Sequence, residues 1–90
     1  MENGYIFRKE YIDKLYKKAH AVYDKMCEEF DTLTLEQMEA LYHKVWLYAD
    51  EADNRADENE DDVDLQRTIV SLIFLSEEAE ALVKEKEAKE

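Results

Sequence analysis

The scarcity of turn-forming residues constrains the fold of this chain most strongly. Its 90 residues include one glycine and no proline. β-Sandwiches and barrels place these residues at their many tight turns, so such folds are excluded. Hydrophobic residues make up 46% of the chain, enough for a core although 40% is charged. The sequence therefore predicts one all-α domain spanning residues 1–90.

Apolar residues that recur every three or four positions predict three helices, over about 5–30, 34–56 and 62–86. The short link after the first helix predicts a small antiparallel three-helix bundle. Each helix has one stripe expected to enter the core. The stripe of the first helix is Ile12, Leu15, Tyr16, Ala19, Val22, Tyr23, Met26 and Phe30. That of the second is Leu35, Met38, Leu41, Tyr42, Val45, Trp46, Ala49, Ala52 and Ala56.

The start of the second helix carries a capping motif. Thr34 and Gln37 have the spacing of a capping box, in which each side chain binds a free backbone N–H of the other residue. Leu33 and Met38 are spaced to form a hydrophobic staple across the same turn. The second helix is therefore expected to begin directly after Thr34.

The third helix carries more apolar residues than one stripe holds. Its core stripe is predicted to comprise Leu65, Ile69, Leu72, Ile73, Ala79 and Val83. Val63, Val70, Phe74 and Ala81 form a second stripe about 120° away. Together with Leu47, these four residues predict self-association as a homodimer. Ser76 marks a place where the helix could break, and residues 84–90 are expected to fray as a polar tail.

The acidic residues are concentrated in one segment. The formal net charge of the chain is −12, and residues 50–64 carry nine acidic side chains against one arginine. Such a charge repels phosphate, so direct nucleic-acid binding is not expected. The acids of this predicted patch are Asp50, Glu51, Asp53, Asp57, Glu58, Glu60, Asp61, Asp62 and Asp64.

The acidic patch has three interpretations. It is a solvated turn that maintains solubility, a surface for a basic partner, or a metal site. Asp57, Asn59 and Asp61 match the first ligands of a calcium-binding loop. Asp62 stands where that loop needs glycine, and Thr68 where it needs glutamate, so a specific calcium site is not expected and no cofactor is predicted.

No constellation of catalytic residues is recognisable. His20, Cys27 and His43 lack the spacing of a zinc site, and one glycine cannot make a phosphate-binding loop. Cys27 is interpreted as a small residue at the edge of the core. The sequence therefore predicts a protein that is not an enzyme.

Two classes of function remain. The first is an acidic interaction protein that inhibits a partner by occupying its basic, nucleic-acid-binding surface as a nucleic-acid mimic. Small acidic helical chains with few cysteines are common among phage and mobile-element inhibitors of bacterial defence nucleases, an analogy of type only. The alternative is a structural or assembly module that homodimerises or binds a partner helix through an apolar stripe.

The expected compartment is the cytoplasm, without membrane contact. Cys27 is the only cysteine, so no intramolecular disulfide can form. The first residues lack the features of a signal peptide. The longest apolar stretch, residues 69–75, is far shorter than a membrane span.

Overall fold

Three helices that pack against one another make up the described part of the chain. The computed structural model describes the backbone of residues 2–55 and 63–89, and the side chains from residue 9 onward within these ranges. The helices are α1 (Glu2–Glu28), α2 (Leu35–Arg55) and α3 (Val63–Lys89). Each helix contacts both others, and this confirms the all-α three-helix prediction.

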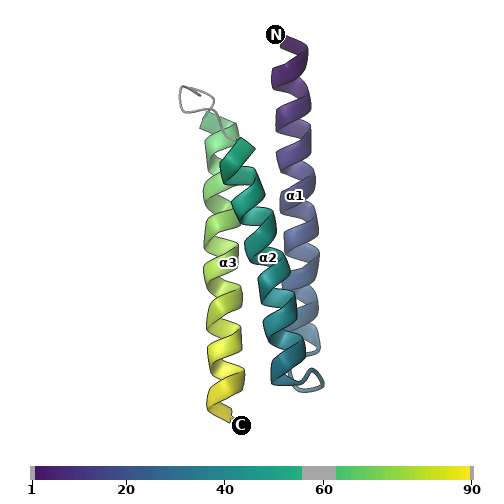
Figure 1. Cartoon of the computed structure of the whole chain (residues 1–90), viewed down its shortest axis with the longest axis vertical. Coiled ribbons are helices and arrows are strands. Elements are labelled where there is room, and N and C mark those ends of the chain that lie inside the picture. The colour runs from purple at the N-terminus through teal and green to yellow at the C-terminus, as the bar shows by residue number, and fades with distance from the viewer. Residues whose placement is uncertain (1, 56–62, 90) are drawn as a thin grey trace.

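The molecule is a rod of 50 × 17 × 16 Å, and its two ends differ in which helices meet there. At the lower end in Figure 1, residues 29–34 join the last turn of α1 to the first turn of α2. The end of α2 and the start of α3 lie at the opposite end (Figure 1). The α2–α3 interface therefore runs along most of the rod.

The core receives one stripe from each helix. It is built of aliphatic side chains and methionine, since these fill a narrow interior without polar atoms that need partners. Its members are Ile12, Leu15, Ala19, Met26, Leu33, Met38, Val45, Ala49, Ala52, Leu65, Ile69, Leu72, Leu75, Ala79 and Val83.

Two residues predicted for the core lie at the surface instead. Trp46 is 44% exposed and Ile73 is 38% exposed. Each follows a buried residue, Val45 or Leu72, and one helical step rotates a side chain by about 100°, away from the centre of the core. Leu75, which was not predicted for the core stripe, is buried. Cys27, assigned to the core edge, is exposed.

The predicted capping box forms at the start of α2. The Gln37 backbone N–H donates to Thr34 Oγ1 at 3.1 Å, and the Thr34 N–H donates to Gln37 Oε1 at 2.9 Å. Leu33 and Met38, the predicted staple, are both buried. Before this cap, the Thr32 and Leu33 N–H groups bind the Glu29 carbonyl, so the chain turns here without glycine.

The C-terminal part of α3 differs from the expected fraying tail. The helix continues to Lys89, and Lys86 is only 8% exposed. Lys86 Nζ donates to the Phe30 carbonyl at 2.8 Å and lies 5.3 Å from the centroid of the Phe30 ring. This carbonyl follows the end of α1, where backbone acceptors lack helical partners, so a lysine from another helix satisfies it.

The expected break site at Ser76 lies within an uninterrupted helix. The Ser76 hydroxyl donates to the Ile73 carbonyl at 2.7 Å, so this nearly buried polar group is satisfied within the helix.

Thr34→Ala is expected to lower the free energy of unfolding by about 1 kcal/mol, because it removes the acceptor of the N-cap hydrogen bond. Urea unfolding monitored by circular dichroism measures this change. Thr32→Ala, an exposed substitution two residues earlier, serves as the control. Equal stabilities of the two variants would contradict the role of the cap.

Lys86→Met is expected to destabilise the fold by about 1–2 kcal/mol, because it leaves the Phe30 carbonyl without its charged donor. Methionine retains most of the buried length of the lysine stem. Lys89→Met is the matched control, since Lys89 also lies over the Phe30 ring, at 4.8 Å, but is exposed. If both variants unfold at the same urea concentration, the hydrogen bond contributes no stability.

Candidate functional site

The structure describes part of the predicted acidic patch. Four of the nine acids, Asp50, Glu51, Asp53 and Asp64, lie in described segments. The others lie outside the described residues, and they are Asp57, Glu58, Glu60, Asp61 and Asp62. The candidate calcium-loop positions Asp57, Asn59, Asp61 and Asp62 also lie outside the described residues. Asp64 is exposed in the first turn of α3, where a negative charge is favourable.

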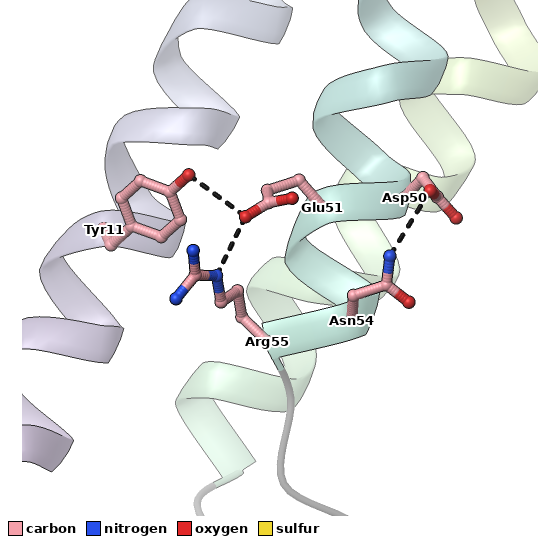
Figure 2. A network of polar contacts seen from close by, with 5 residues as sticks. All are labelled: Tyr11, Asp50, Glu51, Asn54 and Arg55. Atoms are coloured by element: carbon pink, nitrogen blue, oxygen red, sulfur yellow. Dashed lines mark hydrogen bonds and ion pairs between the residues drawn. The ribbon is translucent and has the colours of Figure 1, made fainter.

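Glu51 belongs to a network that joins α2 to α1. Tyr11 Oη donates to Glu51 Oε1 at 3.2 Å, and Arg55 Nε donates to the same oxygen at 2.8 Å (Figure 2). The Arg55 guanidinium lies 5.2 Å from the centroid of the Tyr11 ring. The hydrogen bond from Arg55, aided by that from Tyr11, lowers the pKa of Glu51, and Glu51 in turn raises the pKa of Arg55. Glu51 is thus engaged within the bundle.

Asp50 and Asp53 lie elsewhere on α2, beside α3. Figure 2 shows Asp50 on the side of α2 away from Tyr11, where Asn54 Nδ2 donates to Asp50 Oδ2 at 3.4 Å. Both aspartates line a hollow of about 160 Å³ between α2 and α3. Trp46, Ala49, Ile73 and Ser76 complete its lining. The hollow is smaller than the ~300–1,000 Å³ of small-molecule sites and has room for one side chain.

A second and larger hollow follows the same α2–α3 interface toward the other end of α2. It is lined by Glu39, Ala40, Tyr42, His43, Glu80, Val83, Lys84 and Glu87. The rings of His43 and Trp46, one from each hollow, stack with centroids 6.1 Å apart and an interplanar angle of 12°. We refer to these lining residues together as the α2–α3 groove.

Carboxylates outnumber cations in the α2–α3 groove. Lys84 is its only lysine or arginine, and Lys84 Nζ lies 3.8 Å from Glu80. Tyr42 Oη donates to Glu80 at 3.4 Å, and burial together with the charge of Glu80 raises the pKa of Tyr42. The acidic side chains of the groove are Glu39, Asp50, Asp53, Glu80 and Glu87.

The groove combines negative charge with a partly exposed aromatic side chain. Trp46 is the only tryptophan of the chain, is 44% exposed, and lines the same hollow as Asp50 and Asp53. A cation over an indole ring is attracted by the ring, and a carboxylate beside it adds an ion pair. The arrangement is therefore suited to arginine or lysine side chains of a partner.

The residues weighed for metal binding or nucleophilic chemistry are dispersed. Within residues 9–55 and 63–89, no three His, Cys, Asp or Glu side chains are grouped to hold a metal ion. His20 Nδ1 lies 3.0 Å from Asp24 on the exposed side of α1. A hydrogen bond with Cys27, reinforced by burial and by the charges of Cys27 and Glu78, raises the pKa of Tyr23 to about 12.

The residues predicted for self-association are exposed. Val63 is 57%, Val70 46% and Phe74 58% exposed, and Ala81 is exposed as well. Leu47 is 47% exposed but belongs to α2, where its neighbour Trp46 lines the groove beside α3. Four of the five predicted residues thus belong to α3 and one to α2.

Sequence reasoning did not assign Trp46, Ile73 or the more distant acids to a site. Trp46 and Ile73 were placed in the core, and the acids Glu39, Glu80 and Glu87 lie outside the dense acidic segment. A signal was present on α2, since residues 39, 43, 46, 50 and 53 recur at three- and four-residue steps.

The chain was compared with protein-family models, curated proteins and solved structures, and no match was found. None of the described helices has the length and apolar character needed to cross a membrane.

Glu51→Gln is expected to weaken the junction between α1 and α2 at pH 7, with a smaller effect at acidic pH. The pKa of Glu51 in the folded protein lies below its ordinary value of 4.5, so its ionised form stabilises the fold above that pH. This contribution disappears as the pH falls through the folded-state pKa.

Urea unfolding of both proteins at pH 7 and pH 3 measures the effect. Glu28→Gln, which removes an exposed carboxylate from α1, is the control for the loss of one negative charge. A difference between wild type and Glu51→Gln that stays constant over this pH range would contradict the assigned role of the ionised carboxylate.

Proposed function

We propose that this protein is a non-enzymatic, cytoplasmic interaction protein that binds a basic segment of a partner protein in the α2–α3 groove. The observation that carries the proposal is the position of Asp50 and Asp53 beside the half-exposed ring of Trp46 in one hollow. An arginine of the partner would stack on the indole and pair with one of the two carboxylates.

The negative charge of the groove supports a partner that ordinarily binds nucleic acid. On α2 its acids extend from Glu39 to Asp53, a distance of about 21 Å along a helix. This is about 0.6 of a turn of duplex DNA, along which each strand presents a phosphate every ~3.4 Å. We propose that the rod, with its helices antiparallel, acts as a nucleic-acid mimic and inhibits its partner by occupying the basic surface.

We propose further that the protein is an inhibitor of the kind that phages and mobile elements direct against bacterial defence nucleases. Such a role remains part of the proposal. It is supported by the acidic, aromatic character of the groove, which gives both charge complementarity and an anchor for a basic side chain.

The double variant Asp50→Asn/Asp53→Asn is expected to lose at least tenfold in affinity for the partner, because it removes the carboxylates beside Trp46. The control is Glu28→Gln/Glu29→Gln, which removes the same charge from two exposed residues at the end of α1, far from Asp50 and Asp53. Candidate partners are proteins captured from the native host by the wild type.

Affinity for the isolated partner is then measured by calorimetry at about 50 and 300 mM salt, with Trp46 fluorescence as the local reporter. Binding is expected to weaken with salt, to change the fluorescence and to displace DNA or RNA from the partner. Equal affinities of the groove variant and the control would contradict the groove as the binding site. Simultaneous binding of nucleic acid and this protein would contradict mimicry.

A structural or assembly module is the second candidate function. It is favoured by the exposed apolar residues Val63, Val70 and Phe74 on α3, which lie outside the α2–α3 groove. We propose homodimerisation through this surface, in which the apolar and charged residues of α3 determine how two copies pair.

A further inference from the structure

The exposed apolar residues of α3 lie on a face directed away from the core. Val63, Val70, Phe74 and Ala81 follow one another at steps of seven, four and seven residues, so they share one side of the helix. At about 100° per residue, this side lies about 180° from the middle of the buried stripe around Leu72, and not the about 120° predicted from the sequence, because Leu75 is buried and Ile73 is exposed. We name these four residues the outer stripe of α3.

Charged residues complete the outer stripe into a heptad pattern. Arg67 lies seven residues before Phe74, and Glu77 lies seven residues after Val70. Both are exposed. Repeats of seven residues in two alternating positions are the pattern by which two helices pack side by side. Such pairing requires a second helix with the same spacing.

A second copy of α3 supplies that spacing when it runs in the opposite direction. The two-fold axis of this arrangement passes beside residue 72. A residue that lies a given number of positions before residue 72 then faces the residue of the partner that lies the same number of positions after residue 72. Val70 then faces the partner's Phe74, and Val63 faces the partner's Ala81. In the same register, Arg67 faces the partner's Glu77. Every layer therefore joins either two apolar side chains or two opposite charges.

The parallel arrangement lacks this complementarity. There each residue of the outer stripe faces its own counterpart, so Arg67 meets a second arginine and Glu77 meets a second glutamate. Like charges in facing positions oppose association. The two charged residues thus select the direction of pairing as well as its register.

We propose that the outer stripe of α3 is the site of an antiparallel homodimer centred on residue 72, in which Arg67 and Glu77 form reciprocal ion pairs across a two-fold axis. Six large apolar side chains, three from each copy, leave water in this dimer. Because a two-fold interface uses the same patch on both copies, the one stripe closes the assembly at two subunits. The α2–α3 groove is not part of this dimer interface.

Charge exchange between the two positions tests the proposal directly. Arg67→Glu creates two layers in which glutamate faces glutamate, and Glu77→Arg creates two layers in which arginine faces arginine. Each variant alone is expected to dimerise at least tenfold more weakly than the wild type. An equimolar mixture of the two is expected to form heterodimers, and R67E/E77R in one chain to regain the homodimer.

Sedimentation velocity from about 5 to 500 μM measures the wild type and the four variant samples, and circular dichroism verifies that the variants remain helical. Lys18→Glu is the matched control, because it changes the net charge by the same amount as Arg67→Glu on an exposed part of α1. A monomeric wild type at 500 μM overturns the dimer. Unchanged dimerisation of the single variants, or absence of heterodimers in the mixture, overturns the register.

A second comparison distinguishes this dimer from partner binding in the groove. Phe74→Glu is expected to abolish dimerisation, whereas Asp50→Asn/Asp53→Asn is expected to leave it unchanged. The dimer is also expected to persist at high salt, because its contacts are largely apolar and salt screens the repulsion between two acidic chains. Loss of dimerisation in the aspartate variant, or dimerisation of Phe74→Glu equal to that of the wild type, would contradict the outer stripe as the interface.

Discussion

The narrow core of this bundle is the constraint on which the other features depend. Three helices that pack around one axis bury one stripe each, and small residues such as Ala49, Ala52 and Ala79 occupy part of it. α3 contains more apolar side chains than one stripe can hold, so the surplus is directed outward. The same limit keeps Trp46 and Ile73 at the edge of the α2–α3 interface, where they remain half exposed.

The acidic side chains of α2 have different contacts according to their position around the helix. Glu51 faces α1 and is engaged by Arg55 and Tyr11, so it joins helices. Asp50 precedes it by one residue, lies about 100° around the helix, and lines the groove beside α3. Among the described acids of residues 50–64, Asp50 and Glu51 therefore lie on different sides of α2.

Local signals predicted those parts of the fold that depend on neighbours in sequence. The Thr34–Gln37 capping box was predicted and forms, because both partners lie within one helical turn. The core position of Leu75 and the exposure of Trp46 were not predicted, because both depend on where neighbouring helices lie. The Lys86 hydrogen bond to Phe30 was also missed, since it joins residues 56 positions apart. No periodicity within one helix encodes such a contact.

The amino-acid sequence alone established three helices, their approximate limits, the capped turn before α2 and the surplus stripe of α3, since these follow from helical periodicity and local hydrogen bonding. Only the packing of the helices decided which acids share a surface. It placed Glu80 and Glu87 of α3 beside the α2 side chains of the groove and turned Glu51 toward α1. The physical reason is that a groove is made by two helices, and its residues become neighbours only when those helices pack.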